Sequence, residues 1–139
     1  MAAQAGDNCS TAPTHARTKN GTLSIMQAEP IIDVAFFRTE SGTEPVRDWL
    51  KTLSTADKRA IGGDLKTVQY GWPIGMPVVR KLEPGLWEVR SRLDQRIARI
   101  LFTVRDCRMV LLHGFIKKSE KTPTDDLALA RRRRTQLTP

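Results

Sequence analysis

The stretch VVRKLEPGLWEVRSRLDQRIARILFTVRDCRMVLLHGFIKKSEK, residues 78–121, decides the fold of this chain. Three short apolar runs follow one another in it, and each contains or adjoins arginine or lysine: Leu86–Leu93, Arg96–Val104 and Met109–Ile116. Short runs of this kind, separated by two-residue turn signals, are typical of strands joined by hairpins. The stretch therefore predicts an antiparallel meander.

Alternation along the first two runs assigns side chains to faces. In the first run Glu88, Arg90 and Arg92 point to one side, whereas Trp87 and Val89 point to the other and are expected in the core. In the second run Arg99, on the same face as Ile97, Leu101 and Thr103, lies opposite Ala98, Ile100, Phe102 and Val104. Strands that carry so many cations suggest a surface that holds a polyanion, although a solvated polar face explains a single arginine equally well.

The segments around the meander complete an α+β domain. Ile31–Phe37 is rich in β-branched and aromatic residues and predicts a strand. Two helices follow, the first after Pro45 and the second after a capping box at Ser54–Asp57. A second capping box, Thr122–Asp125, predicts a C-terminal helix that ends in four arginines.

The expected order is β-α-α-β-β-β-α, with the antiparallel meander packed against the helical pair and a C-terminal helix added. Residues 80–82 precede a Pro84-Gly85 turn signal and are a separate lead-in to the meander. Residues 1–28 show no apolar period and are expected to be a disordered extension, so that residues 29–139 form the one folded domain.

Basic charge is concentrated in the second half of the chain. The whole sequence has 23 Lys and Arg against 15 Asp and Glu, and residues 1–79 hold eight of each kind. The excess therefore lies entirely in residues 80–139, the meander and the C-terminal helix. Such clustering favours nucleic acid or another acidic partner, whereas the net charge of +8 alone is ordinary for a soluble domain.

Several classes of protein are disfavoured. No apolar run approaches the roughly 20 residues of a membrane span, and no cationic start with an apolar segment marks a secretory signal. We therefore expect a cytoplasmic protein with no membrane contact. The two histidines and two cysteines are scattered, and no carboxylate constellation suits paired magnesium ions. We expect neither a metal nor another cofactor.

The runs LWEVR, RIARILF and LLHGFIKKSEKTP, together with the order of elements, resemble HigB-like toxins of phage-derived type in the RelE/ParE superfamily. The resemblance covers residues from about Ile31 to Arg134. It implies a RelE-like fold and the toxin of a type II toxin–antitoxin system. Such a toxin cleaves mRNA on the ribosome, arrests translation and growth, and uses no cofactor. It also implies a cognate antitoxin, of HigA-like helix-turn-helix type, through which alone the toxin would be brought to DNA.

The resemblance implies that basic residues on the meander carry the chemistry. Their positions map onto Arg90, Arg99 and either Lys117 or Lys118, and His113 stands in the same strand. The sequence departs from the RelE-like pattern at Glu88, where a basic residue is expected. It also lacks a tyrosine near its C-terminus.

Metal-free RNA cleavage explains why these residue types suit the reaction. A base must take the proton of the ribose 2′-OH, cations must stabilise charge on the phosphate, and an acid must protonate the leaving 5′-oxygen. Arginine suits the phosphate, and His113 could serve as base or acid, although a histidine on an apolar strand is more often simply packed. The catalytic candidates are Arg90, Arg99, His113 and Lys117, and the RNA-binding candidates are Arg80, Lys81, Arg92, Arg96 and Lys118.

Two other functions remain open from the sequence. A ParE-like inhibitor of DNA gyrase would share the fold and bind a protein without cleaving RNA. A non-enzymatic nucleic-acid-binding module would use the same arginines only to hold phosphates.

Overall fold

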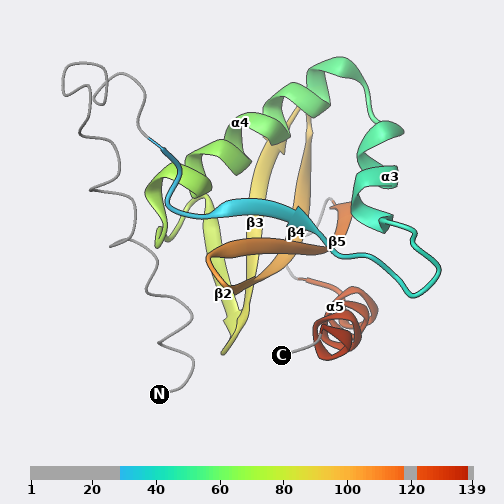
Figure 1. Cartoon of the computed structure of the whole chain (residues 1–139). Helices are drawn as coiled ribbons and strands as arrows, with labels where there is room; N and C mark the ends of the chain where they lie inside the picture. Colours follow the sequence, from blue (N-terminus) through green and yellow to red (C-terminus); the bar gives the residue numbers. More distant parts are fainter. Residues whose placement is uncertain (1–28, 118–121, 138–139) are drawn as a thin grey trace.

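The computed structural model describes residues 29–117 and 122–137 of the 139-residue chain. Within them five strands form one sheet in the order β1-β5-β4-β3-β2 (Figure 1). Their bounds are β1 Asp33–Phe36, β2 Val79–Glu83, β3 Leu86–Leu93, β4 Arg96–Arg105 and β5 Arg108–Lys117. The four C-terminal strands are antiparallel neighbours, and β1 pairs in parallel with β5.

The α+β class with its antiparallel meander is confirmed, and the meander has one strand more than expected. The lead-in at residues 80–82 is part of strand β2, which pairs with β3 across a turn at Pro84-Gly85. Gly85 has φ 79°, a conformation that favours glycine. The proposed extension, residues 1–28, lies outside the described residues.

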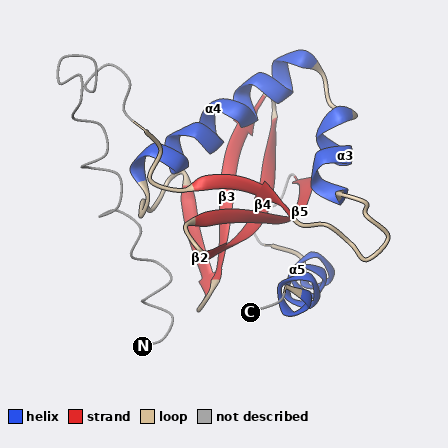
Figure 2. Ribbon diagram, viewed as in Figure 1, coloured by secondary structure: helices blue, strands red, loops and turns tan. Residues whose placement is uncertain are grey.

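Two helices cover one face of the sheet, called here the α4 face. They are α3, Pro45–Lys51, and α4, Thr55–Gly71, which runs across the sheet in Figure 2. Ile61, Leu65 and Val68 of α4 are buried in the same cluster as the inward residues of β3 and β4. Trp87 belongs to this core, as expected from its face, because its ring lies 5.1 Å from that of Trp72.

The third helix, α5, Thr124–Gln136, packs against the opposite face, called here the α5 face. Leu86, Leu101, Leu112 and Ala130 are buried together there. The meander is therefore enclosed by helices on two sides.

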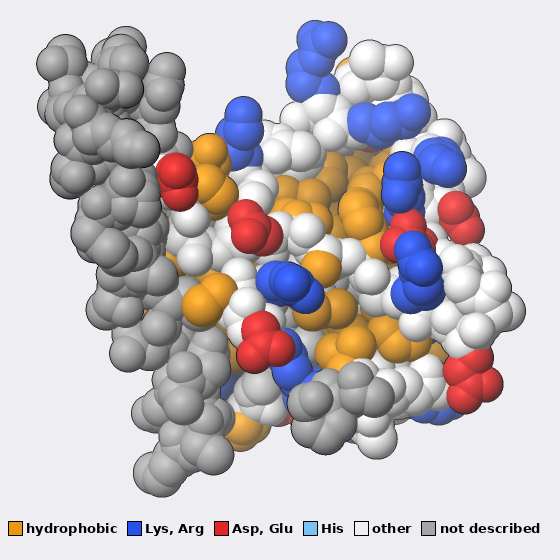
Figure 3. Space-filling model, viewed as in Figure 1, with side chains coloured by type: hydrophobic (Ala, Val, Ile, Leu, Met, Phe, Trp, Pro, Cys, Tyr) orange, Lys and Arg blue, Asp and Glu red, His pale blue; other side chains and the backbone are white. Residues whose placement is uncertain are grey.

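Viewed from the side that carries β1, hydrophobic side chains gather in the middle of the surface, with Lys and Arg around them (Figure 3).

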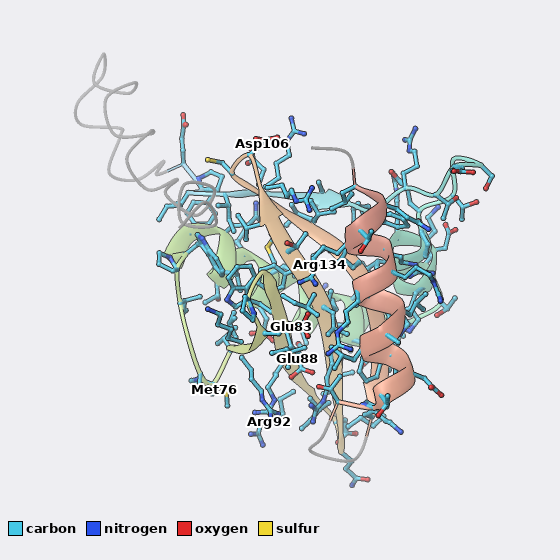
Figure 4. All side chains as sticks on the ribbon, turned by 90° about the horizontal axis from the view of Figure 1, so that it is seen from below. Met76, Glu83, Glu88, Arg92, Asp106 and Arg134 are labelled. Atoms are coloured by element: carbon cyan, nitrogen blue, oxygen red, sulfur yellow. The ribbon has the colours of Figure 1, made fainter. Side chains whose placement is uncertain are left out.

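Glu83 ties α5 to strand β2. Its carboxylate accepts hydrogen bonds from Arg131, at 2.7 Å, and from Arg134, at 3.1 Å. Figure 4 labels Glu83 and Arg134. The hydrogen bond from Arg131, followed by that from Arg134, lowers the pKa of Glu83, while its slight burial opposes the shift. The contacts of ionised Glu83 with the two arginines therefore stabilise the fold above the ordinary glutamate pKa. This stabilisation is lost as the pH falls through the lowered pKa of Glu83. Two arginines of the C-terminal run are thus engaged within the fold.

At one of the two predicted capping boxes the N-cap hydrogen bond forms. Ser54 accepts a hydrogen bond from the backbone N–H of Asp57 at 3.1 Å, which confirms the start of α4. The box at Thr122 is wrong: α5 begins at Thr124, Pro123 is its N-cap, and no side chain caps it. The hydroxyl of Thr122 instead donates to the carboxylate of Glu88, at 2.7 Å.

No helix in the described part of the chain combines the length and the apolar character needed to cross a membrane.

Gly114 provides a test of the packing between α3 and the sheet. A Cβ atom at this position would lie 2.6 Å from ring atoms of Trp49, well inside van der Waals contact. We expect Gly114→Ala to lower the free energy of unfolding by about 1–3 kcal/mol, as overpacked cores do. Urea denaturation of the purified protein measures the effect.

Gly63→Ala is the matched control, because a Cβ atom there meets nothing within 4 Å in the middle of α4. That change should raise the free energy of unfolding by roughly 0.5–1 kcal/mol, the usual difference between glycine and alanine in a helix. Equal stability of the two alanine variants would contradict the close contact with Trp49.

Candidate functional site

The strand register brings two of the candidate arginines together on the α5 face. Arg90 of β3 lies directly opposite Arg99 of β4, and Arg99 lies opposite Phe115 of β5. Directly opposed residues have Cβ atoms about 4.5–5.5 Å apart on the same face of a sheet. These three residues therefore form one row across the middle of the meander, called here the arginine row.

The other two catalytic candidates lie in the rows on either side. His113 is paired with Leu101 in the neighbouring row that also holds Glu88. Lys117 is paired with Ile97, which in turn lies opposite Arg92, in the row beyond. The four candidates thus occupy three adjacent rows of one face, although the sequence alone left their register open.

Arg99 is a buried, paired residue. Its side chain and that of Glu88 both have an exposed fraction of 0%, and Arg99 Nη1 lies 3.4 Å from each carboxylate oxygen of Glu88. Thr122, just before α5, donates a third hydrogen bond to the same carboxylate. Neither a solvated arginine nor an exposed phosphate clamp describes Arg99 in this conformation.

The pair also explains why an acidic residue stands at position 88. The two charges offset one another, which a basic residue at this buried position could not do. Arg80, opposite Glu88 on β2, and Arg90, beside Arg99, are both partly exposed. They add positive charge to the α5 face without the burial that confines Arg99.

His113 contacts both α5 and the arginine row. Its Nε2 lies 2.6 Å from Oδ1 of Asp126, on the first turn of α5. Its ring stacks on that of Phe115, with centroids 5.4 Å apart and an angle of 26° between the planes. The imidazole is therefore held at an edge by a carboxylate and on a face by an aromatic ring.

The RNA-binding candidates divide between the two faces. Arg80 and Arg92 share the α5 face with the arginine row, and Figure 4 shows Arg92 extending away from the sheet. Lys81 lies opposite Trp87, on the α4 face. Arg96 also turns to that face, where its Nη2 lies 3.0 Å from both carboxylate oxygens of Asp57. Lys118 lies outside the described residues.

Two residues that contact His113, Asp126 and Phe115, are not predicted from the sequence. Thr122, for which the sequence predicts a cap, instead contacts Glu88, the partner of Arg99. A signal existed for Phe115, since counting two residues from His113 along the same strand places it on the same face. No sequence signal points to Asp126, because only the packing of α5 brings this residue, thirteen positions after His113, to the histidine.

The run Arg131–Arg134 is used largely within the fold. Besides the two arginines on Glu83, Arg133 donates to the carbonyl of Leu112 at 2.8 Å and lies over the ring of Phe37. Burial lowers the pKa of Arg133, with Arg132 adding to the effect. Among the described residues no group of three or more His, Cys, Asp or Glu side chains could hold a metal ion.

Comparison with protein families gives one match, to the family described as Phage derived protein Gp49-like (DUF891), over residues 48–135. This range includes α4, the whole meander and almost all of α5, and it is more than half of the chain. The chain belongs to this family. A search of curated proteins finds no match.

The buried ion pair predicts a large effect of Arg99→Ala on stability. The substitution leaves the carboxylate of Glu88 buried without its countercharge, which typically costs about 3–5 kcal/mol. We expect urea denaturation to show a loss of this size. Arg92→Ala, an exposed change in the neighbouring strand, should stay within about 0.5 kcal/mol of the wild type.

Replacing both Arg99 and Glu88 tests whether the loss of stability comes from leaving one buried charge unpaired. The double variant Arg99→Leu with Glu88→Leu removes both buried charges and should recover much of the loss. An Arg99→Ala protein as stable as the Arg92→Ala protein would show that the pair contributes little. Because of this pair, lost activity in Arg99→Ala cannot by itself identify a chemical role.

Proposed function

We propose that this protein is the toxin of a type II toxin–antitoxin system and acts as a ribosome-dependent mRNA endoribonuclease. The proposal is supported by its membership of the Gp49-like family, a toxin-like family of RelE and HigB type. The observation that carries it is the register, which sets Arg90, Arg99, His113 and Lys117 in three adjacent rows of one face.

The spacing of these rows fits an in-line attack on a phosphate. His113 and Lys117 lie four residues apart on β5, roughly 13 Å at about 3.3 Å per residue, with Phe115 between them. A scissile phosphate above the arginine row would have the imidazole on one side and the flexible lysine on the other. His113 then takes the proton of the 2′-OH, and the Lys117 ammonium protonates the leaving 5′-oxygen.

The two arginines have different tasks in this arrangement. Arg90 is partly exposed and contacts the phosphate, where its fork stabilises the charge that develops. Arg99 supports that charge from beneath, because Glu88, whose carboxylate also accepts a hydrogen bond from Thr122, holds it inside the sheet. Arg80 and Arg92, which flank the row, bind the RNA backbone. The 2′-OH as nucleophile makes the reaction specific for RNA.

The same proposal assigns the partners. The ribosome presents the mRNA, and a cognate antitoxin of helix-turn-helix type holds the toxin inactive in the cytoplasm. DNA is reached only through that complex. No metal or organic cofactor takes part in the reaction.

Arg90→Ala tests the proposal with the smallest structural disturbance. Losing one donor to a developing charge typically costs on the order of 10²–10³ in rate. We expect induction of the variant to cause no growth arrest, and primer extension to show no discrete cuts in translated mRNA. Arg59→Ala, which removes an exposed cation from α4, should remain as toxic as the wild type.

The wild-type result decides between the rival functions. Discrete cuts that depend on translation support the nuclease. DNA damage with intact mRNA would identify an inhibitor of gyrase. Salt-sensitive RNA binding without mRNA cleavage would identify a non-enzymatic nucleic-acid-binding module.

A further inference from the structure

We infer that Asp126 is a positioning residue: it holds His113 in the tautomer that carries its proton on Nε2 and so leaves Nδ1 as the proton acceptor. The inference rests on the proposed function and adds to it a residue on α5, outside the meander. It also identifies which nitrogen of the imidazole performs the proton transfer.

The contact has the geometry of a strong hydrogen bond. His113 Nε2 and Asp126 Oδ1 are 2.6 Å apart, slightly shorter than the roughly 2.7–2.9 Å typical of charge-assisted N–H···O⁻ hydrogen bonds. The two side chains are 17% and 24% exposed, so water screens the contact only in part. An ionised carboxylate can only accept, so Nε2 must be the donor. A neutral ring then has its lone pair on Nδ1.

A second contact fixes the plane of the ring. Stacking on Phe115 leaves the imidazole little freedom to turn away from Asp126. Since Phe115 lies in the arginine row, this stacking also sets the distance between the imidazole and the arginines. Within the described residues, Asp126 is the one hydrogen-bond partner of the ring, which leaves Nδ1 for a substrate.

Within residues 29–117 and 122–137, the elements packed around His113 carry few other charged groups that could compete with Asp126 for the imidazole. Arg99 of β4 is a diagonal neighbour of His113 in the sheet, and its charge is offset by Glu88. Arg133 of α5 binds the carbonyl of Leu112, the residue before the histidine. Helix α3 packs on the opposite face, where Trp49 meets Gly114. Asp126 is therefore the carboxylate that faces the imidazole from these elements.

Nδ1 of His113 accepts one proton in the cleavage step, and the Lys117 ammonium gives one. The 2′-OH gives its proton to Nδ1, the 2′-oxygen forms a bond to phosphorus, and the bond from phosphorus to the 5′-oxygen breaks. The 5′-oxygen takes a proton from the Lys117 ammonium. The products are a 2′,3′-cyclic phosphate and a free 5′-OH. The Nε2–H donates to Asp126 throughout, first from the neutral ring and then from the imidazolium, as in other carboxylate–histidine pairs.

Nitrogen-15 NMR of the histidine ring tests the tautomer without any reaction. The chain has two histidines, His15 and His113, and a His15→Gln variant assigns the signals. At a pH where the ring is neutral, we expect His113 to show a protonated Nε2 and an unprotonated Nδ1. A proton on Nδ1 instead would overturn the inference, because that nitrogen could not accept another.

Single-turnover cleavage of ribosome-bound mRNA tests the role in catalysis. Asp126→Asn keeps the size of the side chain, while its amide can donate to Nε2 and favour the wrong tautomer. We expect the cleavage rate at saturating toxin to fall on the order of 10²–10⁴-fold, with substrate affinity nearly unchanged. Asp125→Asn removes the same charge from the exposed neighbouring position and should cleave like the wild type.

A purely anchoring role for Asp126 predicts a different pattern. Asp126→Asn would then unfold at lower urea concentration and still cleave at the wild-type rate when folded, which would refute the inference. Asp126→Glu retains a carboxylate and should cleave faster than Asp126→Asn. Failure of the wild-type protein to cleave at all would instead refute the proposed function, whatever the NMR result.

Discussion

The buried pair of Arg99 and Glu88 is the constraint on which the rest of the site depends. Two opposite charges with no exposed surface can persist in a sheet only if they stay together, because each alone would cost several kcal/mol to desolvate. The pair therefore locks the register of β3 against β4. It also recruits Thr122, so that the chain enters α5 over this part of the sheet.

Polar contacts as well as apolar ones hold helix α5 against the sheet. Asp126 lies at its first turn on His113, and Arg131 and Arg134 bind Glu83 near its other end. Between them Ala130 packs into the cluster of Leu101 and Leu112. A helix fixed at both ends can hold a side chain against the sheet with little freedom. That rigidity is what a positioning residue requires.

Much of the fold could be read from the chain, because it depends on periodicity and local turn chemistry. The faces of the meander, the core position of Trp87 and the cap at Ser54 all follow from short-range rules. The expected cap at Thr122 failed because a buried carboxylate offered its hydroxyl a better partner than the helix terminus. The sequence predicts only a lead-in where strand β2 forms, since five residues carry little pattern of their own.

The sequence by itself determined which side chains share a face, since alternation along a strand requires no knowledge of its neighbours. It could not say which residue stands opposite which, because register is set by turns and by pairing across strands. Only the tertiary structure decided that Arg90 faces Arg99 and that Glu88 neutralises Arg99. Only the packing of α5 decided that Asp126 meets His113, because no local rule links residues thirteen positions apart on different elements.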